Sequence, residues 1–149
     1  MESVFVHLRD ASESEVADYL ARTYPFCPGP NWIMDVAGDP ALYIDFYRDL
    51  ESELEDEEKM SLAQCLSHMP TVSVVADISG RHLTGDSHVR DFVCGLLTVF
   101  EGVAQDDYTY HWWTREQIIT GYKVQGHPFF DYWGWRLERK ADGGIIQSV

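Results

Sequence analysis

Apolar and polar residues alternate along several short segments of the chain, and a period of two predicts β-strands with one buried face. Val72, Val74, Ala76 and Ile78 give the most apolar of these segments, which we expect at the centre of a sheet. Turn residues at 38–40 predict a hairpin between the second and third segments. The predicted strands cover residues 4–8, 31–36, 42–46, 71–79, 103–112 and 129–137.

Other segments repeat apolar residues every three to four positions, the spacing of one face of an α-helix. Two of these helices begin at predicted capping boxes, formed by Ser12 with Glu15 and by Thr114 with Gln117. A third helix leads from an acidic segment to Pro70. The clearest apolar stripe predicts a helix that carries Val89, Phe92, Val93, Leu96, Leu97 and Phe100.

The order of these elements predicts an α+β fold, with a mostly antiparallel sheet, the longer helices packed on one face and the other face partly open. The chain runs through a strand, a helix and a hairpin, then a linking helix, then a strand, a helix and two more strands. This order suggests two similar strand-helix-hairpin halves. We expect a single domain over residues 1–140 and a flexible C-terminal tail over residues 141–149.

Aromatic residues are concentrated in residues 102–137, which hold ten of the chain's twenty rings. One interpretation is that these rings fill the core between the sheet and its helices. The other is that some are exposed, because the last two predicted strands carry rings on both faces while the helices cover mainly one. Trp and Tyr often anchor protein interfaces. The candidates for a partner-binding surface are Tyr108, Tyr110, Trp112, Trp133 and Trp135.

Seven of the ten residues from 49 to 58 are acidic. Acidic side chains favour the positive end of a helix dipole, so one interpretation is a solvated helix start. A second is a docking patch for a basic partner, carried by Glu55, Asp56, Glu57 and Glu58. A divalent-cation site is the third, although the spacing and glycine of an EF-hand are absent.

The charge balance narrows the class of partner. The chain has 25 acidic and 11 basic residues, a formal net charge of -14. This charge disfavours binding to nucleic acid or to anionic membranes, since the sequence contains no basic patch. It favours binding to a basic protein. Cys27, Cys65 and Cys94 form no CxxC pair, and Met1 is not followed by a basic and apolar leader. We therefore expect a cytoplasmic protein.

Residues that could carry chemistry are sparse. The histidines lack the HExxH, HxH or Cys/His spacing of metal sites. Asp106 and Asp107 could form a carboxylate pair, but neighbouring strand residues point to opposite faces, so we interpret them as sheet-edge charges that face a partner. The chain also lacks a nucleophile elbow and a phosphate-binding glycine loop. We expect no catalytic residues, no metal and no cofactor.

A further motif begins at the predicted end of the apolar helix. It consists of Gly102, Val103, Ala104, Gln105, Asp106, Asp107 and Tyr108, followed by His111, Trp113, Thr114 and Glu116. This motif resembles a segment of small bacterial proteins, some of which are similar to immunity proteins of polymorphic or contact-dependent toxin systems. The resemblance implies a cytosolic, non-catalytic inhibitor that binds a cognate toxin domain. It assigns no contact residues, because such proteins differ in where they touch their toxins.

Three hypotheses follow from these patterns. The first is an acidic protein-binding module, specifically an immunity protein that neutralises a bacterial toxin. The alternative is a small-molecule-binding protein or a small enzyme, with a pocket lined by Tyr108, Tyr110, His111 and Trp112. The third is a homodimer that hides its aromatic face.

Overall fold

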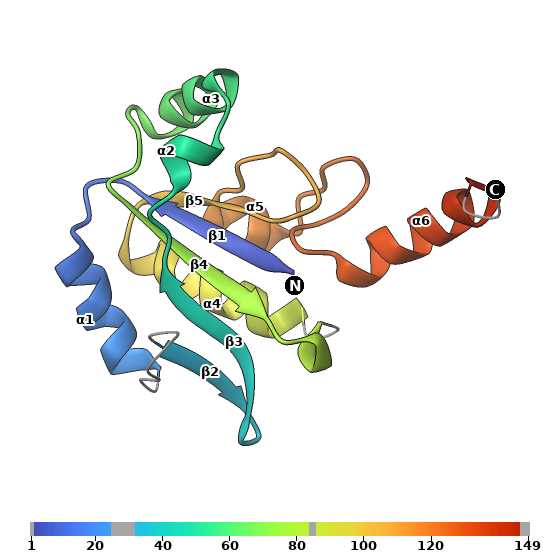
Figure 1. The fold of residues 1–149 in the computed structure, drawn as a ribbon, viewed down its shortest axis with the longest axis horizontal. Helices are drawn as coiled ribbons and strands as arrows, with labels where there is room; N and C mark the ends of the chain where they lie inside the picture. The colour runs from blue at the N-terminus through green and yellow to red at the C-terminus, as the bar shows by residue number, and fades with distance from the viewer. Residues whose placement is uncertain (1, 25–31, 84–85, 147–149) are drawn as a thin grey trace.

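The protein is built around one five-stranded sheet in which every neighbouring pair of strands is antiparallel (Figure 1). The computed structural model describes residues 2–24, 32–83 and 86–146. The order of the strands across the sheet is β2-β3-β4-β1-β5. Their bounds are β1 (Ser3–Leu8), β2 (Trp32–Val36), β3 (Asp39–Phe46), β4 (Val72–Ile78) and β5 (Gly102–Gln105).

The middle of the sheet confirms the strongest strand predictions. The most apolar strand, β4, lies between β3 and β1, with Val4 of β1 opposite Ala76 of β4. β2 and β3 form the predicted hairpin, with Trp32 opposite Ile44. A strand with neighbours on both sides satisfies all its backbone groups within the sheet, which suits the buried sequence of β4.

The main core lies on one face of the sheet. Here α1 (Glu13–Thr23), α4 (Asp86–Val99) and α5 (Arg115–Thr120) pack against side chains of β1, β3 and β4. Phe92 and Leu96 of α4 are fully buried, and a side chain of this kind contributes about 1.5–3 kcal/mol when it leaves water. The capping boxes predicted for α1 and α5 are both present. The helical stripe therefore packs on the sheet as predicted.

A second, smaller cluster covers one end of the opposite face. It is formed by α2 (Leu50–Glu53) and α3 (Asp56–Leu66), whose Leu62 is fully buried, together with Val103 of β5 and Trp112. Figure 1 shows this helix pair standing at one end of the sheet. The opposite face is thus partly covered at that end, while the longer α1 and α4 lie on the first face.

The predicted strand over residues 103–112 is too long, because β5 ends at Gln105. At the next residue, Asp106 accepts a hydrogen bond from the backbone N–H of Tyr108 over 3.1 Å and turns the chain out of the sheet. The chain returns at Trp113, which forms a single bridge with Ala104. The first half therefore has the predicted strand-helix-hairpin order, and the second has β4, α4, β5 and this one bridge.

The predicted strand over residues 129–137 is wrong, because the chain is helical from Tyr132 onward, in α6 (Tyr132–Ile146). Asp131 caps this helix by accepting a hydrogen bond from the backbone N–H of Gly134 over 3.0 Å. Phe130 just before it has a φ of 50°, which lies outside the strand region. Alternating rings resembled a strand, but the local cap and turn favour a helix.

The helix α6 extends away from the sheet towards the C-terminus (Figure 1). It runs to Ile146, so the expected boundary between a domain of residues 1–140 and a tail of residues 141–149 falls inside it. Helical backbone thus continues across that boundary.

The structure also bears on membrane crossing and on the state of the cysteines. No helix in the described ranges has the length and apolar character needed to cross a lipid bilayer. Cys65 and Cys94 are free thiols, and Cys65 is exposed. Cys27 lies outside the described residues.

Beneath Trp112, three polar side chains are linked through His7. The alternation in β1 did not predict this contact. The fully buried His7 has its Nδ1 atom 2.8 Å from the hydroxyl of Ser73 and its Nε2 atom 3.3 Å from the side-chain oxygen of Gln105. The Trp112 ring meets the imidazole edge-on at 5.6 Å. Burial lowers the pKa of His7 to about 4, although the bond to Gln105 opposes this shift.

We expect His7 to make stability depend on pH. Its pKa is lower in the folded than in the unfolded protein, so the unfolded state binds more protons between about pH 6.5 and pH 4. The free energy of unfolding should fall by about 3 kcal/mol across this window, fully only as the pH reaches 4. Urea unfolding at several pH values should show this fall in the wild type and a smaller one in His7→Gln.

The matched control is His68→Gln, which removes an exposed imidazole. It should keep the wild-type dependence on pH. If His7→Gln and the wild type lose the same free energy between pH 7 and pH 4, the explanation from His7 is wrong.

Candidate functional site

The five rings predicted to bind a partner do not form one surface. None of them lies in a strand, and their exposures differ widely. Tyr110 is 84% exposed and Trp133 is 52% exposed, whereas Trp112 is 9% exposed. Tyr108 and Trp135 are partly buried. The prediction of a row of rings on a bare sheet face is therefore wrong. The ring-bearing parts of the two segments that were expected to be strands are instead a loop and the helix α6.

Trp112 belongs to the smaller core rather than to a surface. Its indole N–H donates to the hydroxyl of Ser61 on α3 over 3.0 Å, and its ring covers the imidazole of His7. A buried indole that has a hydrogen-bond partner is well suited to join two layers. Trp112 thus fixes α3 against the sheet.

Tyr108 and Trp135 pack together beside α6. Their rings stack with centroids 6.0 Å apart, and the Tyr108 hydroxyl donates to the carboxylate of Glu2. Trp133 lies elsewhere on α6 and is exposed, as is Leu137 one turn later. The aromatic pocket expected from Tyr108, Tyr110, His111 and Trp112 is not formed as a unit, because Tyr108 faces α6 and Trp112 is under α3.

The two neighbouring acids, Asp106 and Asp107, have different roles. Asp106 is 3% exposed and accepts hydrogen bonds from the backbone N–H groups of Tyr108, Thr109 and Phe130. Burial raises the pKa of Asp106, although these three donors oppose the shift. Asp107 accepts from the backbone N–H of Ser3 over 2.8 Å. Only Asp107 is accessible to a partner, so the prediction for Asp106 is wrong.

The predicted acidic patch lies on α2 and on the start of α3. We call residues 49–58 the acidic arm. Glu55 and Glu58 form a capping box at the start of α3, which confirms the interpretation as a helix start. The docking patch stays a prediction. Glu58 is partly buried. The exposed acids of the arm are Asp49, Glu51, Glu53, Glu55, Asp56 and Glu57.

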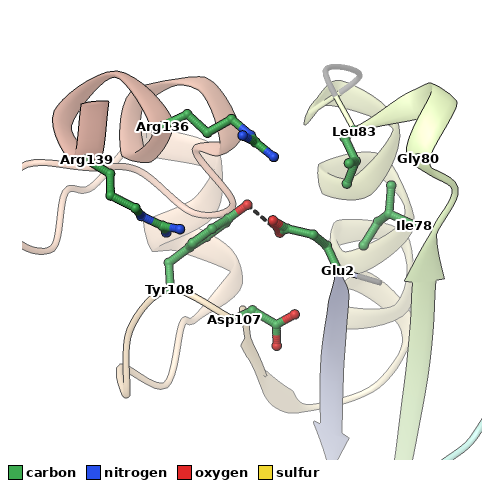
Figure 2. A pocket seen from close by; sticks show the side chains of 8 residues that line it. All are labelled: Glu2, Ile78, Gly80, Leu83, Asp107, Tyr108, Arg136 and Arg139. Atoms are coloured by element: carbon green, nitrogen blue, oxygen red, sulfur yellow. Dashed lines mark hydrogen bonds between the residues drawn. The ribbon is translucent and has the colours of Figure 1, made fainter. Parts of the chain in front are cut away.

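A cleft of about 680 Å³ separates α6 from the end of the sheet (Figure 2). Arg136 and Arg139 of α6 point into it from one side, and Glu2 lies across from them. Tyr108 stands between these charges with its hydroxyl bound to Glu2. The remaining lining residues are Ile78, Gly80, Leu83 and Asp107. The volume lies within the range of small-molecule sites.

His127 attaches α6 to the rest of the protein. Its Nδ1 atom lies 2.9 Å from the carboxylate of Asp131 and its Nε2 atom 3.0 Å from that of Glu138. The imidazole stacks on Trp135 with ring centroids 3.9 Å apart. Burial disfavours the charged imidazolium, but the two carboxylates outweigh burial and raise the pKa of His127. In its protonated form, His127 is thus a cation between two anions and fixes the first turns of α6.

Gly134 leaves space for this arrangement. A Cβ atom at this position would lie 1.7 Å from a carboxylate oxygen of Asp131. The same carboxylate group caps α6 and pairs with His127. A larger residue at position 134 would therefore displace the Asp131 carboxylate from the cap and from His127.

The cleft is absent from the predictions because residues 129–137 were expected to form a strand, which left α6 unrecognised. Three local signals of this helix are present. Asp131 is a favourable N-cap residue, and residues 136–141 include several good helix formers. Tyr132, Arg136 and Arg139 then follow one another at helical spacing. The opposing residues, Glu2 and Ile78, come from distant parts of the chain, and no local pattern links them to α6.

Two observations concern metal ligation and acid–base chemistry. Within residues 2–24, 32–83 and 86–146, no three His, Cys, Asp or Glu side chains are grouped so that they could hold a metal ion. His7 and Ser73 are in contact, but both are buried and the imidazole has a lowered pKa. Such a histidine is a weak general base.

Comparisons of the chain with family models, with curated proteins and with solved structures return no significant match.

The contrast between the two acids gives a stability prediction. Asp106→Ala leaves three backbone N–H groups without their acceptor and should lower the free energy of unfolding by about 3 kcal/mol. Asp107→Ala is the matched control and should cost less than about 1 kcal/mol, since its side chain is exposed. Urea unfolding followed by tryptophan fluorescence measures both. Equal losses would contradict the assigned roles.

The His127 contacts give a second pH dependence, with the opposite sign to that of His7. The pKa of His127 is higher in the folded than in the unfolded protein, so its stabilisation is complete below about pH 6.5 and is lost as the pH rises through the raised value. Hydrogen-exchange protection factors of α6 amides should therefore fall from pH 6 to pH 8. His127→Gln should reduce this fall, and a fall of unchanged size in that variant would refute the role of His127.

Proposed function

We propose that this protein is a non-catalytic, acidic binding module that docks a basic protein through the acidic arm. The observation that carries the proposal is the set of six exposed carboxylates on a helix pair that stands at one end of the sheet (Figure 1). The carboxylates lie on residues 49–57, so a partner meets them together. Met60 on α3 is 64% exposed and adds an apolar contact beside them.

The basic residues on either side of the arm do not cancel its negative charge. Arg48 is the cation just before the arm, and its guanidinium pairs with Glu13 of α1 over 2.8 Å. Lys59 is the cation just after the acidic run. With a net charge of -14 behind it, the arm produces a negative field that accelerates encounter with a basic surface.

We further propose that the partner is a bacterial toxin domain and that the protein is its immunity protein. Support comes from the resemblance of residues 102–116 to a segment of such proteins, together with the acidic charge. Structurally, that segment contains β5, the turn at Asp106 and the start of α5. These residues build the framework, which agrees with a resemblance that assigns no toxin contacts.

The test requires a defined partner, and a basic protein encoded next to this gene is the first choice. Neutralising three acids in Glu51→Gln/Asp56→Asn/Glu57→Gln should slow association about tenfold at low salt, because steering by the arm is weakened. The salt dependence of the association rate should decrease as well. Stopped-flow or surface plasmon resonance measurements give both quantities.

A variant with the same change of net charge provides the control. Asp18→Asn/Asp35→Asn/Glu116→Gln neutralises three exposed acids outside the arm. It should slow association by less than about threefold. The docking role of the arm is refuted if both triple variants slow association equally, and the immunity function is refuted if the wild type fails to protect cells from the neighbouring gene's product.

A further inference from the structure

The cleft between α6 and the sheet lies far from the acidic arm. In β1, Leu8 lies opposite Gly102 and Phe5 lies opposite Gln105, so residues that follow Gln105 are near the start of β1. The cleft is lined by residues at this start, whereas Arg9, just after the end of β1, donates to the carbonyl of Leu66 on α3. The two regions therefore lie at opposite ends of one strand.

The arginines on the basic wall of the cleft have no anionic partner among the described side chains. The Cζ atom of Arg136 lies 4.6 Å from the centroid of the Tyr132 ring, and its N–H groups donate no hydrogen bond to the described part of the chain. Among the residues whose side chains are described, neither Arg136 nor Arg139 has an ion pair. Guanidinium groups bind carboxylates and phosphates through paired hydrogen bonds. This wall is thus suited to an anionic group.

The opposite wall is acidic and fixed. The Glu2 carboxylate accepts from the Tyr108 hydroxyl, and the Asp107 carboxylate accepts from the backbone N–H of Ser3. These bonds hold both carboxylates in place. Burial raises the pKa of Asp107, and the bond from Ser3 opposes this shift. Ile78 and Leu83 add apolar surface beside Glu2 (Figure 2).

We propose that the cleft binds a small zwitterionic molecule, with a carboxylate or phosphate on Arg136 and Arg139 and an ammonium group towards Glu2 and Asp107. The two walls carry equal and opposite charge, so a simple anion is repelled by one wall and a simple cation by the other. A zwitterion complements both. The cleft of about 680 Å³ accommodates such a molecule together with an apolar body against Ile78 and Leu83.

The requirement for both charges is tested with three matched probes. The tripeptide Gly-Leu-Gly carries an ammonium group, an apolar side chain and a carboxylate. Its N-acetylated form retains only the anion, and its C-amidated form retains only the cation. Titration calorimetry and NMR chemical-shift mapping should show the zwitterion binding at least tenfold more tightly than either blocked form, with shifts at Tyr108 and Trp135.

Matched variants assign the binding to the cleft. Arg139→Gln should weaken binding of the zwitterion at least fivefold and leave the fold intact, since its guanidinium forms no hydrogen bond or ion pair with another described side chain. Lys140→Gln removes the same charge from the next residue, which does not line the cleft, and should leave binding within twofold. Asp107→Asn should weaken binding of the zwitterion and of the amidated peptide, and it should leave binding of the acetylated peptide unchanged.

Three results would overturn the proposal. They are the absence of binding by all three peptides at 10 mM, equal binding of the zwitterion and its acetylated form, and equal effects of Arg139→Gln and Lys140→Gln. A phosphate-bearing zwitterion, phosphoethanolamine, tested alongside the peptides, shows which anionic group the arginines prefer. None of these outcomes depends on the acidic arm, so they leave the proposed docking function untouched.

Discussion

The buried carboxylate of Asp106 determines how the second half of the chain is arranged. It accepts three backbone N–H groups, two from the turn that follows β5 and one from Phe130, which is 24 residues away. Without an acceptor at this point, three backbone donors, one of them fully buried, would lack a partner, at a cost of about 3 kcal/mol. The same side chain therefore ends β5 and fixes the backbone from which α6 begins.

The acidic arm and the basic residues of α6 lie at opposite ends of the sheet. Arg136, Arg139 and Lys140 lie on α6, and the cleft beside this helix is also lined by Glu2 and Asp107. Trp112 joins the arm to the sheet, while His127 and Trp135 join α6 to the loop before it. Each charged element is thus attached by aromatic packing together with a specific polar contact. This separation allows two binding functions that do not compete for one surface.

The sequence was sufficient where local pattern and tertiary burial agree. The alternation in β4, the stripe of α4 and the boxes at Ser12 and Thr114 each predicted the observed element. It was insufficient at residues 129–137, where alternating rings imitate a strand while Asp131 starts a helix. It could not reveal the cleft at all, since Glu2, Ile78 and Arg136 meet only through the fold.

Gly134 shows how little sequence change the α6 attachment tolerates. The carboxylate that would collide with any Cβ at this position both starts the helix and pairs with the imidazole of His127. A side chain at position 134 would displace this carboxylate, so the helix cap and the contact with His127 would be lost together. The absence of one Cβ atom thus couples the start of α6 to the loop before it.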